Sequence, residues 1–323
     1  MYPVFDVRKV KLKPLAERQH DLPLTGVKEL ACDQPMESSE LDALVERIIA
    51  AREQNAAVIL LMGGHVIKTG MSRFVIDLMR RGFVTHVGFN GACAIHEYEL
   101  SLIGGTSENV AQYISAGQFG LWKETGGIND IVRQGAAQGY GIGEALGKAI
   151  SEGNFPNKDL SIMAAGFELR VPVTVHVSIG QDIIHAHPNF DGASFGAGSH
   201  RDFLTLAHSV SQLEGGVLLN VGTAIMGPEV YLKALSMARN VAHQEGRRIV
   251  DITTAVFDMQ PIQSRDYRSE PSKDQPEYYH RFWKTILVRT VRDGGVSYYV
   301  QGDHRETISS LWHKLTTKRS EVR

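Results

Sequence analysis

The feature that most constrains this chain is a repeated order of apolar run, small residues and helical pattern. Three apolar runs end at small residues: AAVILLM (56–62) at Gly63-Gly64, THVGF (85–89) at Asn90-Gly91, and GGVLLNVG (215–222) at Gly222-Thr223. A segment with apolar residues at helical spacing follows each run. Buried strands that alternate with helices are typical of a doubly wound sheet. We therefore expect an α/β fold with a mostly parallel, Rossmann-like sheet and helices on both faces.

The remaining segments fit one domain built on this sheet. Residues 1–38 contain scattered prolines and no sustained period, which predicts an irregular N-terminal arm, and residues 39–323 are expected to form a single Rossmann-like domain. The pattern LDALVERIIAAREQ (41–54) predicts a helix with Ser38 or Ser39 as its N-cap. The glycine-punctuated stretch 106–150 predicts a helical excursion over one edge of the sheet.

The C-terminal third predicts the last elements of the fold. Two apolar runs, TILVRTV (285–291) and GVSYYV (295–300), predict late strands, and a helix from residue 305 to 314 is expected to close the fold. Before them, QSRDYRSEPSKDQPE (263–277) has the composition of a surface loop or lid.

Composition narrows the class of protein. The 323 residues are 43% hydrophobic and 22% charged, with a formal net charge of -2, so no nucleic-acid partner is expected. The two cysteines, Cys32 and Cys93, form no CxxC pair, which suits a reducing compartment. No secretory h-region is present, and no apolar run approaches the roughly 20 residues of a membrane span. We expect a cytoplasmic protein without a membrane partner.

The stretch Val171–Asp202 is the first candidate site. It begins as a buried strand (172–177), breaks at 178–180, and then places Asp182, His185 and His187 in a loop of small residues. Ligands of α/β sheets sit beyond the carboxyl ends of parallel strands, so polar groups at this point predict chemistry. An ordinary polar surface loop is the alternative.

Small residues at strand ends indicate where a nucleotide could lie. Backbone N–H groups could approach a phosphate or ribose at four turns: Gly63-Gly64, Asn90-Gly91-Ala92, Gly222-Thr223 and Gly302-Asp303. The sequence GGHVIKTG lacks the spacing of GxGxxG, however, and glycine at such a turn can also be purely steric.

Carboxylates, histidines and one lysine supply further candidates. Carboxylates suit recognition of a cationic amine, although an acid such as Glu97 can also stabilise a helix N-terminus. His185 and His187 could bind a metal ion. The alternative is that these histidines are packing residues. Lys284 follows Trp283 ahead of an apolar run, where a desolvated amine could attack a carbonyl or an imine; a solvated strand end is the alternative.

Taken together, these segments resemble deoxyhypusine synthase, an NAD-dependent enzyme that transfers an aminobutyl group from spermidine to a protein lysine. Gly64–Gly70 resembles the family's SNLISSG turn, and Asn90-Gly91-Ala92 with His96-Glu97 resembles its TAGG…EE segment. Pro172-Val173 with Asp182 resembles IPVF…DGSLGD. Ile252–Asp258 is similar to INTAQEFD, and Pro276-Glu277 with Trp283-Lys284 is similar to PDE…SWGK.

The resemblance implies a role for each matched residue. Lys284 would form a covalent imine, with Asp182 and Glu97 as further catalytic groups. NAD would contact the set Gly64, His65, Thr69, Asn90, Gly91, Ala92, Gly222, Thr223, Thr254, Ala255, Gly302 and Asp303. The amine would contact the set His96, Glu97, Asp182, Asp258, Glu277 and Trp283. No metal is expected. The family also implies a homotetramer and a possible protein lysine acceptor.

Three departures predict a different substrate from that of deoxyhypusine synthase itself. The family's glycine between Trp283 and Lys284 is absent, its GGGVVKHH histidine has no counterpart in residues 220–228, and the first acid of DGSLGD is missing. His185, His187 or His304 could supply the missing proton transfer. We therefore expect an NAD-dependent enzyme acting on a small cationic amine. The alternatives are a metal-dependent hydrolase using His185 and His187, and a nucleotide-binding regulatory protein without turnover.

Overall fold

A computed structural model describes residues 1–262 and 266–321, and its centre is a parallel sheet of six strands. The spatial order is β5-β3-β2-β6-β7-β8. The strands are β2 (Val58–Met62), β3 (His86–Asn90), β5 (Val173–His176), β6 (Val217–Val221), β7 (Thr253–Asp258) and β8 (Val296–Gln301). Counted among themselves, they run 3-2-1-4-5-6, the order of dinucleotide-binding Rossmann folds. The expected α/β Rossmann-like class is confirmed, and the order reverses between β2 and β6.

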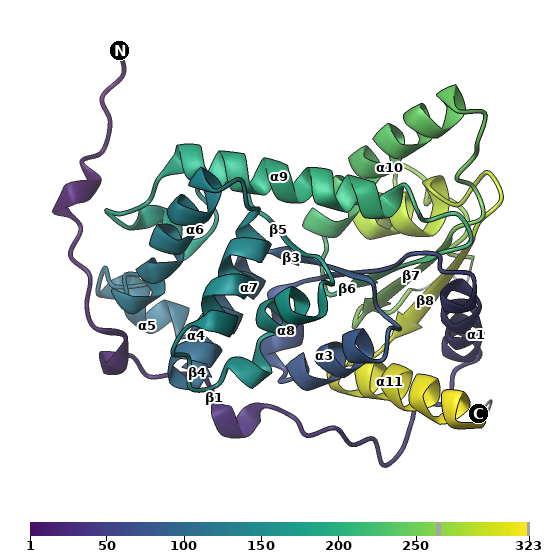
Figure 1. The fold of residues 1–323 in the computed structure, drawn as a ribbon, viewed down its shortest axis with the longest axis horizontal. Helices are drawn as coiled ribbons and strands as arrows, with labels where there is room; N and C mark the ends of the chain where they lie inside the picture. Colours follow the sequence, from purple (N-terminus) through teal and green to yellow (C-terminus); the bar gives the residue numbers. More distant parts are fainter. Residues whose placement is uncertain (263–265, 322–323) are drawn as a thin grey trace.

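Helices cover both faces of the sheet (Figure 1). One face packs against α1 (Ser39–Glu53), α3 (Ser72–Arg80) and α11 (His304–Glu321), and the other against α9 (Gly192–Val210) and α10 (Met226–Gln244). Because side chains alternate along a strand, Leu60 and Met62 enter the first core while Ile59 and Leu61 enter the second. Both faces are therefore apolar, which explains the unbroken run VILLM.

The helix of 41–54 forms as expected. The Ser38 side chain accepts a hydrogen bond from the backbone N–H of Leu41 at 3.2 Å and so caps α1. Leu41, Leu44 and Ile48 lie on its buried face. This amphipathic stripe attaches α1 to the sheet.

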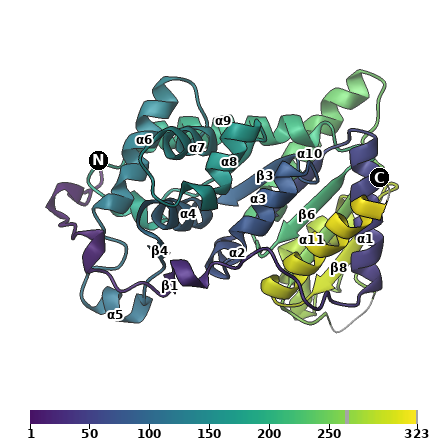
Figure 2. The same ribbon diagram turned by 60° about the horizontal axis from the view of Figure 1, so that its bottom comes forward.

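A helical group lies at the β5 end of the sheet (Figures 1 and 2). It consists of α4 (Gly91–Ile103), α5 (Val110–Ser115), α6 (Gly127–Ala137), α7 (Ile142–Glu152) and α8 (Ile162–Leu169). Asp202 of α9 accepts hydrogen bonds from Val175 N at 2.8 Å and from Gly143 N at 3.0 Å. The Asp202 carboxylate therefore pairs with a backbone N–H group on the open edge of β5 and with another at the start of α7.

The N-terminal arm packs on its own chain along much of its length. β1 (Leu22–Pro23) pairs with β4 (Gly105–Thr106), and Lys13 forms a bridge with Trp122. Arg18 is buried. The short helices are α2 (Gly64–Lys68), η1 (Val7–Lys9), η2 (Leu15–Glu17), η3 (Leu24–Gly26), η4 (Glu124–Gly126), η5 (Lys158–Leu160), η6 (Ile183–Ala186) and η7 (Pro276–Tyr279).

One expected strand is wrong. TILVRTV (285–291) lies largely in η8 (Trp283–Arg289), a short π-helix, while GVSYYV forms β8. Parallel neighbours such as β7 and β8 need a crossover connection, and η8 provides part of it by packing on both strands. A short apolar run fits a buried helix as well as a strand. The expected lid at 263–277 falls partly outside the described residues.

No helix in the described part of the chain has the length and apolar character required to cross a membrane.

Candidate functional site

A cavity of about 220 Å³ lies beyond the carboxyl ends of β3 and β5, between α4, the arm and the loop after β5. Both charge signs line it. Its residues are Arg18, Lys68, Ala92, Ile95, His96, Glu99, Ser107, Glu108, Val110, Phe119, Gln181, Asp182 and Ile183. The cavity thus brings together Ala92, His96 and Asp182 from the sequence-based set, and adds cations that the sequence did not single out.

Asp182 lies against the start of α4. A Cβ atom at Gly91 would stand 2.0 Å from Asp182 Oδ2, so only glycine permits this approach. The Asp182 side chain is 13% exposed, and burial raises its pKa to about 6. An acid of this kind changes protonation near neutral pH, which suits it to binding or accepting a proton.

His185 stands beside Asp182 in a defined tautomer. Its Nδ1 accepts hydrogen bonds from the backbone N–H groups of Gly180, at 3.0 Å, and of Asp182, at 3.2 Å. In a neutral imidazole the other nitrogen must then carry the proton. That Nε2 is buried without a hydrogen-bond partner and lies 3.8 Å from Asp182 Oδ2.

A buried ion pair forms one wall of the cavity. Arg18 donates from Nη1 and Nη2 to the two oxygens of Glu99 at 2.9 and 2.6 Å, and its Nη1 lies 3.9 Å from Glu108. The Arg18 charge is therefore already matched by protein carboxylates. Glu108 in turn accepts from Trp122 Nε1 at 2.9 Å.

His96 connects this wall to the end of β2. Its Nδ1 lies 2.9 Å from Thr106 Oγ1, and burial lowers its pKa to about 4, so the ring is neutral at neutral pH. A Cβ atom at Gly64 would stand 3.2 Å from His96 Cδ2. The His96 ring therefore forms a boundary shared by the cavity and the turn after β2.

Small residues also lie where the ends of β2, β6 and β8 come close together. A Cβ atom at Gly63 would stand 2.1 Å from Gly222 O, and one at Gly222, whose φ is +62°, would stand 2.5 Å from His304 Nε2. The rings of His65 and His304 are 5.7 Å apart. His304 is 3% exposed, and its Nδ1 is buried without a hydrogen-bond partner. We call this region of strand ends, at the switch between β2 and β6, the crevice, because ligands of open α/β sheets bind at this place.

The crevice gathers part of the expected cofactor set. Gly64, His65, Gly222 and Thr223 follow β2 and β6, and Gly302 and Asp303 follow β8. Asn90, Gly91 and Ala92 lie at the start of α4, where the Asn90 side chain caps the helix by accepting from Cys93 N at 3.0 Å. Asp258 ends β7.

Other expected site residues have structural contacts elsewhere. Glu97 is 1% exposed and accepts hydrogen bonds from Met163 N at 3.0 Å, from Ile162 N and from Ser161 Oγ, so it caps α8. Burial raises the pKa of Glu97 to about 8, although these donors act in the opposite direction.

Three cofactor candidates do not face the crevice with a free group. Thr254 and Ala255 lie near the amino end of β7 and are fully buried, and Thr254 Oγ1 donates to Ile286 O at 2.7 Å. Thr69 Oγ1 donates to the backbone of its own helix at His65 O, 3.0 Å away.

Lys284 lies toward the opposite edge of the sheet from Asp182. It is 6% exposed, and its Nζ stands 3.6 Å from the centre of the Tyr278 ring, a cation–π contact. The helix that carries it packs on β7 and β8, whereas Asp182 follows β5 at the other edge. Neighbouring strands lie about 4.8 Å apart, so most of the width of the sheet, roughly 20 Å, separates Lys284 from Asp182. Glu277 and Trp283 line a separate hollow beside Pro276.

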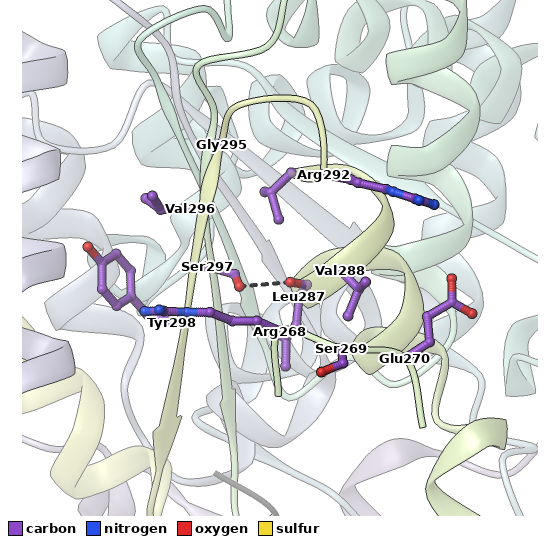
Figure 3. A pocket seen from close by; sticks show the side chains of 11 residues that line it. Arg268, Ser269, Glu270, Leu287, Val288, Arg292, Gly295, Val296, Ser297 and Tyr298 are labelled. Carbon is purple, nitrogen blue, oxygen red and sulfur yellow. Dashed lines mark hydrogen bonds between the residues drawn. The ribbon is translucent and has the colours of Figure 1, made fainter. Parts of the chain in front are cut away.

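A larger cavity, of about 660 Å³, lies along β8 and is shown in Figure 3. Arg268, Glu270 and Arg292 line it together with apolar side chains of η8, and Ser297 Oγ donates to Leu287 O at 2.7 Å. None of the expected site residues lines it. We place the candidate site in the smaller cavity because titratable groups with shifted pKa values converge there at strand ends.

The metal alternative gains no geometric support. His187 Nε2 bonds to Gly120 O at 2.7 Å, while His185 Nδ1 faces backbone donors, so the two rings serve different partners. Among residues 1–262 and 266–321, no group of three or more His, Cys, Asp or Glu side chains is arranged to hold a metal ion.

Sequence reasoning missed Arg18, Lys68 and Thr106. Arg18 belongs to the arm, and its partner Glu99 is 81 positions away. Thr106 is one of many threonines and carries no local signal. Lys68 ends the short helix that follows β2. Its closeness in sequence to that strand end was the only sign that it could line a site.

No protein-family profile and no curated protein matches this chain. Among solved structures, a ternary complex of AgrE with ornithine and NAD⁺ is similar with a TM-score of 0.51 and 15% identity, over 89% of this chain and 35% of that chain. A putative LOR/SDH protein from Methanococcus maripaludis S2 is similar with a TM-score of 0.50 and 15% identity, over 90% of this chain and 73% of that chain.

The chain therefore spans about a third of AgrE. A putative deoxyhypusine synthase from Entamoeba histolytica has a TM-score of 0.46 and 9% identity, over 87% of this chain and 88% of that chain, which is too weak to carry an argument. The similarities to AgrE and to the LOR/SDH protein show that the chain shares their Rossmann-like fold.

Proposed function

We propose that this protein is an NAD-dependent enzyme that oxidises a small cationic amine. The observation that carries the proposal is the shared boundary between the crevice and the cavity, where the His96 ring lies beside Gly64. A dinucleotide bound in the crevice would bring its nicotinamide ring next to an amine bound in the cavity.

The crevice suits a dinucleotide in two respects. It lies at the switch point of the sheet, where Rossmann folds bind such ligands. The buried His304 Nδ1 lacks a partner, and a buried polar atom of this kind calls for a ligand or a water molecule. The AgrE complex, which has this fold, contains NAD⁺.

The cavity suits an ammonium group. Arg18 is neutralised by Glu99 and Glu108, which leaves the Asp182 carboxylate as the acceptor at the start of α4. A charge-assisted hydrogen bond from an ammonium to such a group stabilises binding by roughly 1.5–3 kcal/mol. The ornithine of the AgrE complex is also a cationic amine.

The chemistry follows from these positions. NAD supplies, when bound, an acceptor for a hydride from the carbon that carries the amine. An ammonium must lose a proton before that carbon can release a hydride. Asp182, whose pKa burial raises to about 6, would take this proton, and hydride transfer from the neutral amine then gives a protonated imine as the product.

The test has two stages. Calorimetric titration with NAD should show binding, and putrescine, spermidine, ornithine and arginine should then be screened for NAD reduction by absorbance. We expect reduction with at least one amine, and its loss in Asp182→Asn while NAD binding persists. A folded protein that binds no NAD contradicts the proposal. Binding without reduction by any amine favours a regulatory nucleotide-binding protein instead.

Covalent transfer through Lys284 is not needed for this reaction. The distance across the sheet separates Lys284 from the cavity within one chain, so the transfer step stays a sequence-based prediction with its own test, given below.

A further inference from the structure

A chain of hydrogen bonds links the Arg18–Glu99 ion pair to His96. Thr106 Oγ1 donates to Glu99 Oε2 at 2.7 Å and lies 2.9 Å from His96 Nδ1. Thr125 Oγ1 donates to the other oxygen of Glu99, also at 2.7 Å. Glu99 therefore accepts four hydrogen bonds, and its side chain is 1% exposed.

This chain fixes which nitrogen of His96 carries the proton. A carboxylate paired with arginine can only accept, so the single Thr106 hydroxyl proton points toward Glu99. The Thr106 oxygen then accepts from His96, and Nδ1 must carry the hydrogen. Because the low pKa keeps the ring neutral, Nε2 is left with a lone pair. His96 thus contributes an acceptor to the cavity that it lines.

Lys68 contributes a positive charge without a protein partner. Within the described residues its side chain makes no hydrogen bond or ion pair, in contrast to Arg18, whose charge two carboxylates match. It is exposed, so it stands at the opening of the cavity. The cavity therefore combines two acceptors, Asp182 and His96, with one unmatched cation.

We propose that the cavity binds a zwitterionic amino acid, whose ammonium is accepted by Asp182 and His96 Nε2 and whose carboxylate pairs with Lys68. The inference rests on the proposed function and narrows its substrate from amines in general to amino acids. Simple diamines and polyamines would place an ammonium near Lys68 and be disfavoured. His185 lies beside this carboxylate, with its unpartnered Nε2 3.8 Å from Asp182 Oδ2.

Matched ligand pairs test the proposal. L-ornithine is compared with putrescine and L-leucine with isopentylamine, because each amine is its amino acid without the carboxylate. Binding is measured calorimetrically with and without NADH. We expect each amino acid to bind roughly ten- to a hundredfold more tightly than its amine, the ratio of one charge-assisted contact.

Variants assign the contacts. Lys68→Met should bring the ratio within each pair close to one, whereas Lys28→Met, at an exposed lysine outside the cavity, should leave the ratio unchanged. Thr106→Val removes the hydroxyl that fixes which nitrogen of His96 carries the proton, so it should weaken binding of amino acid and amine alike. Thr106→Ser keeps the hydroxyl and should bind both as wild type does.

The outcomes separate the two proposals. If wild type binds each amine as tightly as its amino acid, or if Lys68→Met keeps the preference, the zwitterion proposal is overturned while an amine-oxidising function stands. If amines alone reduce NAD, the same conclusion holds. If neither class binds with or without NADH, both proposals fail.

Discussion

Arg18 of the N-terminal arm and Glu99 of α4 form a two-pronged ion pair, with N–O distances of 2.9 and 2.6 Å, in which both side chains are 1% exposed. The pair ties the arm to the wall of the candidate site. The arm is thus part of the site's own structure, and the charge of Arg18 is not available to a ligand.

We expect Arg18→Met to destabilise the fold by about 3–5 kcal/mol, because it leaves the Glu99 carboxylate buried and unpaired. Urea denaturation measures the loss. Combining it with Glu99→Met should recover much of the stability, since an apolar pair leaves no lone charge. Arg8→Met, at an exposed pair with Asp6, is the control and should change little. An Arg18→Met variant as stable as this control contradicts the assignment.

Asp182 should make stability depend on pH. Its folded pKa of about 6 exceeds the ordinary 3.8, so between these values the folded chain holds more protons than the unfolded one. Stability therefore falls as pH rises through this window and is constant above it. Asp182→Asn should remove this slope and be more stable than wild type above about pH 6, by about 2–3 kcal/mol. Urea denaturation of both proteins across this pH window measures the difference. If the stability of the variant changes with pH as that of wild type does, burial of Asp182 is not the cause of the slope.

Gly222 should be required for the crevice. Gly222→Ala places a methyl group against His304 in addition to straining a residue with a φ of +62°. Gly246→Ala is the matched control, because its φ is +70° but nothing lies within 4 Å of the added atom. Both should lose about 1 kcal/mol from backbone strain, and only Gly222→Ala should also lose NAD affinity. Equal NAD binding by both variants would place the cofactor elsewhere.

Lys284→Arg should fold and retain binding of NAD and amine, because arginine preserves the cation–π contact with Tyr278 and the residue lies across the sheet from Asp182. The covalent prediction is examined separately by borohydride reduction during turnover, followed by peptide mass spectrometry. An adduct on Lys284 in wild type retains the transfer hypothesis. Turnover with no adduct removes it and leaves simple oxidation.

The sequence by itself determined the architecture. Apolar runs that end in Gly63-Gly64 and Gly222-Thr223 specify parallel strands because both faces of such a sheet are buried and its strand ends must turn tightly. It also singled out Asp182 as a candidate, since polar groups just after a buried strand lie at the edge where ligands bind. These are local signals, carried within a few residues of one another. His96 became a candidate only through the resemblance to deoxyhypusine synthase.

Only the tertiary structure decided what the charges do. Glu97 looked like an amine ligand, but packing turns it to the start of α8, 65 positions along the chain. Arg18, Thr106 and Glu99 act as a unit because folding brings the arm against α4. TILVRTV became a helix because β7 and β8 pair in parallel and need a crossover between them. Hydrogen bonding and burial depend on partners distant in sequence, so spacing along the chain does not encode them.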